Sequence, residues 1–529
     1  MDINWPQNSI IYHIYPRSFK DTNGDGIGDL QGIIDKIDYL TYLGVNAVWL
    51  SPIYKSPQKD FGYDVSDYKR VDKCYGTIKK FEELAEKLHK KNIRIMMDYV
   101  PNHTSSKHPW FEKSRSSRDN TKRNWYVWRN PKKDGSPPNN WLSVFGGSAW
   151  QWDKKTKQYY LHTFDLNQPD LNWHNNDVEK HMLSVINYWL KRGADGFRVD
   201  AIYHLFKNQD FGDEPENPNY STDSLPYYKL FHTKTYALPK TIELMRRISH
   251  LLKRSGGKFM VSEVHTGPED LMKMYKNVDW RYFQPFNFSL IFLPWIAKTQ
   301  KEYVDQYDRQ IGKTYFPCYV SGNHDVKRAA TRIGEKQSRN LAIMLLTLRG
   351  FSYIYSGDEL AMTDTPIAKD KVMDTFELHS PGLGLGRDPQ RTPMQWDTTK
   401  NAGFSTDSPW LPVNKNYKKL NVQAQMQDKK SHLNLYKKLI NLKKTSPAIK
   451  EGEYIPLPMP APNVYSYLRE KGAQKVLVVV NFDNKPKKLS LGYKEARIIL
   501  DSFLTREPNK KVSLVDFKLK PDEGIIFEL

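Results

Sequence analysis

The sequence is poor in cysteine: its 529 residues include only Cys74 and Cys318. Two cysteines so far apart in a chain of this length do not make the disulfide framework typical of secreted proteins. The scarcity favours a reducing compartment, so we expect the protein to be cytoplasmic.

Long apolar segments are also missing. The chain has no run of 18 or more apolar residues, so no membrane-spanning helix is expected. The first residues, MDINWPQNSIIYHIYPRSF, do not show the basic start and long apolar core of a secretory signal peptide. We therefore expect neither a secretion signal nor a membrane partner.

The net charge of +20 is not concentrated in one segment. Lysines occur in pairs along the chain, mixed with acidic residues, and no DNA- or RNA-binding motif accompanies them. This pattern is typical of a lysine-rich solvated surface, so no nucleic-acid partner is expected. Aromatic residues make up 13% of the chain, which suits sugar binding but equally suits a large core.

Short apolar strands and amphipathic helices alternate from residue 10 onward. Helices are predicted near residues 30–44, 79–91, 178–193 and 338–348. About eight strands in such an alternation predict an α/β protein with a (β/α)₈ TIM barrel. The predicted strands lie near residues 10–19, 45–53, 93–100, 195–201, 258–264, 280–288, 318–323 and 351–357.

Two regions break this alternation. The first, rich in Trp, Asn, Pro and Gly, reads as a small subdomain inserted after the third strand. The second, from about residue 450, consists of short strands separated by turns and predicts an all-β sandwich domain. The predicted domains are a barrel of residues 1–103 and 173–449, an inserted subdomain of 104–172, and a C-terminal β-sandwich of 450–529.

Polar clusters follow four of the predicted barrel strands. DYVPNH ends the third strand, GFRVDA contains Asp200, SEV contains Glu263, and SGNHD ends at Asp325. Side chains at the carboxyl ends of barrel strands face the active site. One such carboxylate could cap a helix, and one such histidine could be a buried core residue. Four clusters at one end of a barrel instead indicate a catalytic site.

Asp200 and Glu263 have the placement that glycoside hydrolysis requires. Enzymes that retain configuration hold two carboxyl groups about 5–5.5 Å apart, and neighbouring strands lie about 4.8 Å apart. Arg198 points to the same side as Asp200 and is expected to keep it ionised. Glu263, partly buried beside a negative Asp200, is expected to hold its proton. Further contacts with the sugar are expected from Asp325, His103 and His324.

The four clusters resemble, in type, order and spacing, the strand-end motifs of glycoside hydrolase family 13, the α-amylase superfamily. The resemblance covers essentially the whole chain. It implies a barrel, an inserted B domain, a β-sandwich C domain, and retention through a covalent β-glucosyl–enzyme. By this resemblance Asp200 is the nucleophile, Glu263 the acid/base and Asp325 the transition-state stabiliser.

Further segments resemble the oligo-1,6-glucosidase and α-glucosidase (maltase) subgroup. They are QPDLN at 168–172, RDPQRTPMQW at 387–396 and DFGYD at 60–64. The resemblance implies a dead-ended pocket for the non-reducing glucose, suited to exo-cleavage, with Asp60 and Arg391 on its outer hydroxyls. The other expected pocket residues are Tyr63 and Phe164. At the eighth strand, YSGDEL departs from the more usual YYGDE, but Ser356 has no proposed catalytic role.

Ala201, directly after the proposed nucleophile, bears on linkage. In this subgroup Ala or Thr there accompanies α-1,4 preference, whereas Val accompanies α-1,6 preference. The resemblance therefore implies a small maltose-like or sucrose-like substrate and an α-glucosidase that releases glucose.

The loop of residues 21–29 has oxygen-bearing residues at alternate positions and a glycine at the sixth position, like the first half of a calcium loop. Its twelfth position is Gly32 rather than Glu, which excludes an EF-hand. A polar turn would also fit this pattern. The family carries a metal at this place, so the resemblance implies structural Ca²⁺, with Mg²⁺ as the alternative. The expected ligands are Asp21, Asn23, Asp25, the Ile27 carbonyl and Asp29.

Two other functions remain open. The same scaffold could serve an α-1,6-glucosidase (isomaltase), a transglycosylase or isomerase, or an amylase, which product analysis separates. No Arg-Leu-Asp-Arg-Phe segment of the kind that marks sucrose isomerases is present. The family also includes non-catalytic, transporter-associated binding proteins, which would predict a membrane span and an eroded triad, whereas this chain keeps all three carboxylates. The sequence carries no signal for the oligomeric state.

Overall fold

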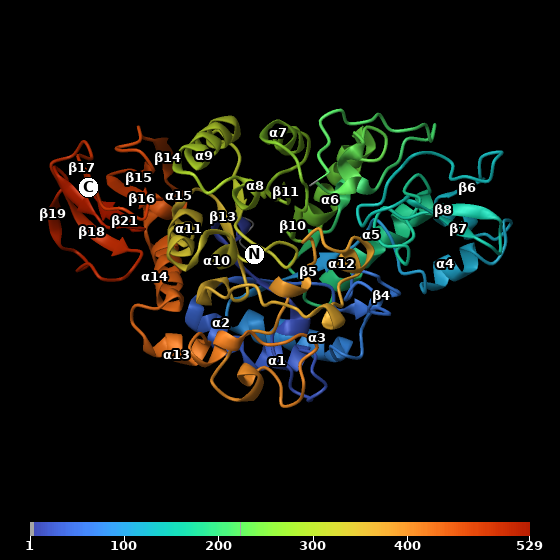
Figure 1. Cartoon of the computed structure of the whole chain (residues 1–529), viewed down its shortest axis with the longest axis horizontal. Helices are drawn as coiled ribbons and strands as arrows, with labels where there is room; N and C mark the ends of the chain where they lie inside the picture. The colour runs from blue at the N-terminus through green and yellow to red at the C-terminus, as the bar shows by residue number, and fades with distance from the viewer. Residues whose placement is uncertain (1–4, 223) are drawn as a thin grey trace.

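Eight parallel strands form the centre of the computed structural model, which describes residues 5–222 and 224–529 (Figure 1). The sheet has the order β11-β10-β9-β5-β2-β1-β13-β12. The Val320 N–H in β12 donates to the Asn287 carbonyl just after β11 (3.1 Å), which closes the barrel. The predicted (β/α)₈ fold is confirmed. The barrel strands are β1 (Ile10–Ile14), β2 (Ala47–Leu50), β5 (Arg94–Tyr99), β9 (Gly196–Val199), β10 (Phe259–Ser262), β11 (Phe283–Pro285), β12 (Cys318–Val320) and β13 (Phe351–Tyr355).

Amphipathic helices cover the outside of the barrel. In α3 the residues Phe81, Leu84 and Leu88 recur at helical spacing and are buried, because this face packs on the strands. The Thr77 side chain accepts the Lys80 N–H (3.2 Å) and so caps the start of the same helix. The outer helices are α1 (Leu30–Asp35), α2 (Ile37–Leu43), α3 (Ile78–Lys90), α5 (Asn176–Leu190), α6 (Pro239–Arg254), α7 (Pro268–Asn277), α8 (Ser289–Phe292), α9 (Ala297–Ile311), α10 (Ala329–Ile333), α11 (Glu335–Thr347) and α14 (His432–Thr445).

The helix predicted over residues 30–44 is wrong as a single element. It is divided into α1 and α2, because Lys36 leaves the helical conformation and its N–H bonds to the Ile33 carbonyl in a tighter turn. The predicted end at Gly44 is correct: this glycine has φ 90°, a left-handed conformation that favours glycine.

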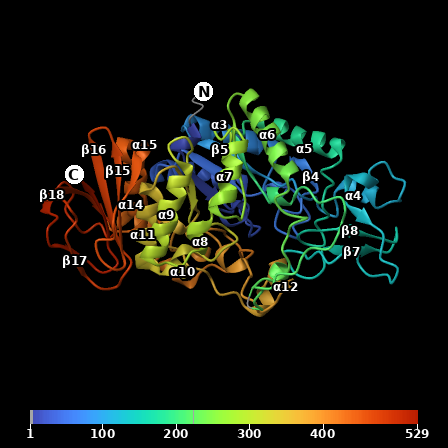
Figure 2. The same cartoon turned by 90° about the horizontal axis from the view of Figure 1, so that it is seen from above.

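The region between β5 and α5 forms a lobe beside the barrel. It contains α4 (Pro109–Ser114) and a small antiparallel sheet in the order β6-β8-β7. Aromatic rings supply its core; Phe111 stacks on Trp128 with centroids 5.7 Å apart. Figure 2 shows this lobe at the opposite end of the molecule from the C-terminal strands. Its strands are β6 (Trp128–Arg129), β7 (Trp150–Asp153) and β8 (Gln158–Leu161). The loop between β2 and α3 holds β3 (Tyr54–Lys55) and β4 (Asp67–Val71).

The C-terminal region is built from two unequal antiparallel sheets. The six-stranded sheet has the order β14-β15-β16-β21-β18-β19, and β17 pairs with β20 in a second sheet. Val476 and Val478 of β16 belong to the core shared with the barrel helices, whereas Leu477 and Val479 pack with the second sheet. The predicted C-terminal all-β domain is confirmed. Its strands are β14 (Glu453–Pro456), β15 (Val464–Lys471), β16 (Gln474–Asn481), β17 (Lys487–Leu489), β18 (Glu495–Asp501), β19 (Lys511–Ser513), β20 (Phe517–Leu519) and β21 (Gly524–Glu528), preceded by α15 (Pro447–Glu451).

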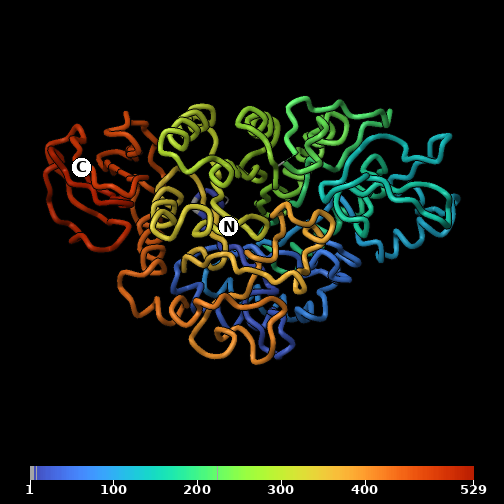
Figure 3. Tube along the Cα trace, viewed as in Figure 1, coloured from blue at the N-terminus to red at the C-terminus, as the bar shows by residue number. Residues whose placement is uncertain are grey.

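A long segment after β13 returns to the beginning of the barrel. Figure 3 shows this orange segment running beside the blue N-terminal quarter of the chain. The Asp21 N–H donates to the Phe404 carbonyl (3.0 Å), and the Trp410 N–H donates to the Gly26 carbonyl (3.0 Å). The segment contains α12 (Thr375–His379) and α13 (Val422–Gln427). Across residues 5–222 and 224–529, no helix is both long and apolar enough to span a membrane.

Candidate active site

The strand register brings Asp98, Arg198, Asp200 and Glu263 to one end of the barrel. Arg198 lies opposite Asp98 in the β5–β9 pair, and Val199 lies opposite Ser262 in the β9–β10 pair. The ladder continues past the strand ends: the N–H of Asp200 donates to the Tyr99 carbonyl (2.8 Å), and that of Glu263 to the Val199 carbonyl (2.9 Å). Asp200 and Glu263 are therefore neighbours at the carboxyl ends of adjacent strands.

Arg198 is buried between three carboxylates. Its Nη1 lies 2.9 Å from Asp98 Oδ1 and 2.8 Å from Asp200 Oδ1, and its Nη2 donates to Glu263. One guanidinium thus orients both proposed catalytic carboxyl groups, as a planar fork of donors can. Three carboxylates around one positive charge favour retention of a proton within the group.

Asp200 and Glu263 are electrostatically coupled through Arg198. Burial raises the pKa of Asp200 well above its usual value, and Arg198 offsets this only in part. Burial would also raise the pKa of Glu263, but Arg198 and then His265 outweigh it and lower the pKa to about 2. Because Arg198 donates to both carboxylates, one proton belongs to the coupled pair, and an ionised Asp200 beside a protonated Glu263 stays a prediction.

Asp325 lies in the same cavity, beside two arginines and a histidine. Arg391 Nη2 donates to its Oδ1 (2.7 Å), Arg387 Nη1 lies 3.5 Å from the same oxygen, and His324 Nε2 lies 3.3 Å from Oδ2. Burial would raise the pKa of Asp325, but His324, Arg391 and Arg387 together hold it far below its usual value. Asp325 is therefore a permanently ionised acceptor at neutral pH.

The closed end of the cavity is polar. Asp60 accepts from Arg387 Nη2 (2.8 Å) and from Gln168 Nε2 (2.9 Å), and Arg387 also pairs with Asp374 (2.6 Å). Asp60 and Arg391 were both expected to contact the outer hydroxyls of the glucose; in the structure, the arginine that pairs with Asp60 is Arg387. Arg387 lies four residues earlier in the same motif, so the motif predicts a contact here but not which of its arginines makes it.

Burial favours the neutral form of both proposed site histidines. Burial lowers the pKa of His103 to about 4 and that of His324 to about 3. His324 Nε2 lies 2.9 Å from the Tyr63 hydroxyl, which in turn donates to Asp98 (3.1 Å). Neutral rings can accept as well as donate hydrogen bonds, which suits contacts with sugar hydroxyls.

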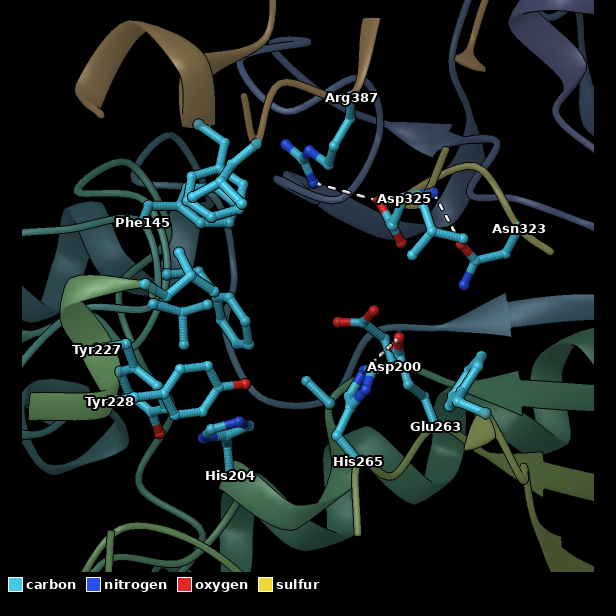
Figure 4. A pocket seen from close by; sticks show the side chains of 18 of the residues that line it. Phe145, Asp200, His204, Tyr227, Tyr228, Glu263, His265, Asn323, Asp325 and Arg387 are labelled. Carbon is cyan, nitrogen blue, oxygen red and sulfur yellow. Dashed lines mark hydrogen bonds and ion pairs between the residues drawn. The ribbon is translucent and has the colours of Figure 1, made fainter. Parts of the chain in front are cut away.

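These groups surround a cavity of about 900 Å³. Figure 4 shows Asp200, Glu263 and Asp325 facing Phe145, Tyr227 and Tyr228 across it. Arg198, His324 and Arg391 do not line the cavity but hold the carboxylates that do. The predicted residues that line it are Asp60, Tyr63, His103, Phe164, Asp200, Glu263 and Asp325.

Comparison with known proteins identifies the family of the barrel, and relatives match the chain along its whole length. A family model for the α-amylase catalytic domain matches residues 13–452. This chain belongs to the α-amylase family. It is an enzyme of the glycoside hydrolase class. The structure of a trehalulose synthase superposes on it with a TM-score of 0.90 at 34% identity, covering 99% of this chain and 100% of the other.

Other members of the α-amylase family resemble the chain along its length. An oligo-1,6-glucosidase of Parageobacillus thermoglucosidasius is 35% identical, with 100% of both chains covered. An α-glucosidase of Apis mellifera is 38% identical over 97% of this chain and 94% of its own. The structure of an α-glucosyl transfer enzyme superposes with a TM-score of 0.91 at 35% identity, covering 99% of each chain.

Sequence reasoning missed one wall of the cavity. Aromatic side chains from residues 225–236 and 288–292 line it, together with Phe145 and Phe376, which stack with centroids 4.9 Å apart. These segments are loops and short helices without a periodic pattern. A cluster of unpatterned aromatic residues next to a strand end was the available signal.

Side chains of the loop of residues 21–29 accept hydrogen bonds from the backbone around them. Asp21 accepts the Gly26 N–H (2.9 Å), and Asp29 accepts the Gly32 N–H (2.7 Å) and caps α1. Asn23 and Asp25 face each other, with Nδ2 and Oδ2 3.2 Å apart. Within the described residues, no three His, Cys, Asp or Glu side chains gather so as to hold a metal ion.

Proposed function

We propose that the protein is a retaining, exo-acting α-glucosidase that releases glucose from the non-reducing end of short α-glucosides. The observation that carries this proposal is the neighbouring pair Asp200 and Glu263, which line the cavity and are joined by the single buried guanidinium of Arg198. Carboxyl groups so closely set suit the double displacement that retains configuration. Relatives named oligo-1,6-glucosidase and α-glucosidase support the same activity.

In the proposed reaction, Asp200 attacks the anomeric carbon while Glu263 protonates the glycosidic oxygen. The aglycone leaves, and a covalent β-glucosyl–enzyme remains on Asp200. Glu263 then removes a proton from water, which displaces Asp200 and returns the α-configuration. Asp325 accepts hydrogen bonds from the glucose hydroxyls, and the Asp60–Arg387 pair closes the end of the pocket.

Either protonation of the coupled pair is compatible with this reaction. A proton on Asp200 and a proton on Glu263 are two forms of one singly protonated pair, and they respond to pH together. Their ratio therefore scales the rate by a constant factor and does not move the pH optimum. Substrate that separates Glu263 from Arg198 would favour the reactive form.

We propose an α-1,4 preference, supported by Ala201, which lines the cavity directly after Asp200. Wild-type enzyme is expected to release glucose from maltose at least about tenfold faster than from isomaltose. Ala201 has φ 46° and ψ 35°, a left-handed conformation that a β-branched residue adopts poorly. Ala201→Val should therefore lower the melting temperature. Because Val at this position accompanies α-1,6 preference, the same variant should also reverse or erase the preference for maltose.

Parallel assays on maltose, isomaltose, sucrose and trehalose, with product chromatography, check this prediction. Ala201→Gly is the matched control, since it adds no bulk and relieves the backbone; it should keep the maltose preference. Faster wild-type cleavage of isomaltose would contradict the linkage proposal and leave the mechanism intact. Conversion of sucrose to an isomeric disaccharide would favour the isomerase alternative, and no turnover at all would favour a binding protein.

We also propose that the loop of residues 21–29 binds structural Ca²⁺. Oxygen donors at alternate positions support the proposal. The carboxylates of the loop do not form a ligand set by themselves, and the Asn23 amide oxygen and the Ile27 carbonyl oxygen would supply the further ligands. Chelation is expected to lower the melting temperature, since free Ca²⁺ at 100 times its Kd stabilises by about 2.7 kcal/mol. Asp25→Ala should abolish the response to chelator, and Asp407→Ala, an exposed aspartate nearby, should keep it. An unchanged melting temperature in wild type would reject the proposal.

We propose a cytoplasmic location. Two free cysteines, Cys74 and the buried Cys318, support it, because free thiols persist in reducing compartments. The partners proposed are small oligosaccharides or disaccharides, in keeping with the size of the cavity.

A further inference from the structure

A second cavity, of about 420 Å³, lies at the lobe between β5 and α5 that carries β6 and β8 (Figure 1). None of the described residues that line it also lines the catalytic cavity. Its lining includes three arginines, Arg118, Arg123 and Arg129. The one carboxylate among the described lining residues is the exposed Asp119. Its volume is within the range of about 300–1,000 Å³ that is typical of small-ligand sites.

Aromatic rings hold two of these arginines in place. The Arg123 Cζ lies 3.5 Å from the centroid of the Trp128 ring, and the Arg129 Cζ lies 3.4 Å from that of Phe211. Stacking on a ring fixes the plane of a guanidinium, and the N–H groups at its edge can still bind an oxyanion. Within the part of the chain that the structure describes, Arg129 donates only to the Trp128 carbonyl, through Nη1 (2.8 Å). Its Nε and Nη2 therefore remain for a ligand.

The three arginines are also without an anionic partner: in residues 5–222 and 224–529, none of them forms an ion pair. The carboxylate that acts on Arg123 is Asp153, which is itself bound by Arg115 Nε (2.6 Å). Burial lowers the pKa of Arg123 to about 10, Asp153 offsets this only in part, and Arg118 lowers the pKa further. A group of partly buried cations without a counter-charge favours an anionic ligand.

We propose that this second cavity binds a phosphoryl group, either as free phosphate or as part of a phosphorylated sugar. The phosphoryl oxygens accept from the unused N–H groups of Arg129 and Arg118, since guanidinium forks match oxyanions with charge-assisted hydrogen bonds. Thr121 and Asn124 also line the cavity, and their hydroxyl and side-chain amide donate to nothing in the described part of the chain. Such donors suit further phosphoryl oxygens or the hydroxyls of an attached sugar.

Titration calorimetry of the whole enzyme, with inorganic phosphate and with glucose 6-phosphate as probes, tests the inference. We expect one phosphate to bind per chain with a Kd below about 1 mM at constant ionic strength. If the Kd of glucose 6-phosphate is at least about tenfold lower than that of phosphate, the cavity binds a phosphorylated sugar. If it is equal or higher, the cavity binds free phosphate.

Arg129→Gln and Arg118→Gln should each raise the Kd for phosphate by about tenfold or more, since each removes a charge-assisted hydrogen bond. The melting temperature without ligand shows that each variant is folded, and Arg118 is exposed, so its replacement does not depend on the packing around Phe211. Arg254→Gln is the matched control: it removes the same charge from an exposed position on α6 and should leave the Kd unchanged.

Absence of binding of both probes to wild type would overturn the inference. An equal Kd in wild type and in the folded Arg118→Gln and Arg129→Gln variants would also overturn it, because phosphate would then bind elsewhere on the enzyme. An equal loss in Arg254→Gln would do the same, since it would reflect the net charge of the protein and not a site. All of these outcomes are measured as binding, so none of them bears on the proposed α-glucosidase function.

Discussion

Asp200→Asn is expected to lower kcat/KM for every α-glucoside by on the order of 10⁵-fold, because removal of a covalent nucleophile stops both displacement steps. The loss should be the same for good and poor leaving groups, since the bond to the anomeric carbon cannot form in either case. Glucose release, measured with maltose and with 4-nitrophenyl α-glucoside, checks both statements.

The same substitution is expected to stabilise the fold at neutral pH. Burial raises the pKa of Asp200, so its contribution to stability is fully present below the unfolded pKa and is lost as pH rises through the folded pKa. The asparagine side chain of the variant carries no such charge, so its melting temperature should exceed that of wild type increasingly as pH rises above the unfolded pKa of Asp200. A stable but inactive variant would show that activity is maintained at a cost in stability.

Asp98→Asn is the matched control for Asp200→Asn. Asp98 contacts the same Arg198 but does not line the cavity. We expect it to lose activity by about 10²-fold through misplacement of Arg198, far less than Asp200→Asn. Residual activity above about 1% in Asp200→Asn, or equal losses in the two variants, would remove Asp200 from the role of nucleophile.

The barrel and the catalytic carboxylates were predictable because their signals are local. Each barrel strand is a short apolar run buried on both faces, and the polar residues that follow such a run mark the strand ends that carry Asp200 and Glu263. The break between α1 and α2 was not predictable, because the amphipathic pattern continues through Lys36. Predicting the position of β11 was harder, as it has three residues within an aromatic segment.

The rest of the site depends on contacts that are distant in sequence. Arg387 reaches Asp60 across 327 residues, and no local pattern shows which of two nearby arginines does so. The aromatic segment of residues 225–236 is held by buried Glu214, which accepts the N–H groups of Thr233 and Lys234 (2.8 Å each). The coupling of Asp200 and Glu263 through Arg198 was not predictable, because only the side-chain geometry shows that Arg198 reaches both carboxylates.

Glu263→Gln is expected to act on a different part of the reaction. Maltose needs a proton on its leaving group, so kcat/KM for maltose should fall by about 10³–10⁴-fold, the range of general acid catalysis. α-Glucosyl fluoride needs no such proton, and its first step should slow by less than about tenfold. The alkaline limb of the pH profile should also flatten, because the variant has no acid to lose as pH rises.

Azide separates the two roles by the configuration of the product. In Glu263→Gln the glucosyl–enzyme still forms on Asp200, and azide, which needs no general base, should attack it to give α-glucosyl azide at an increased rate. In an Asp200→Ala variant azide would instead attack the substrate directly and give the β-anomer, since a single displacement inverts configuration. Equal losses on maltose and on α-glucosyl fluoride in Glu263→Gln, with no azide effect, would mean that Glu263 positions Arg198 and does not transfer the proton. Such a positioning role is chemically reasonable, because Glu263 and Asp200 contact the same guanidinium of Arg198.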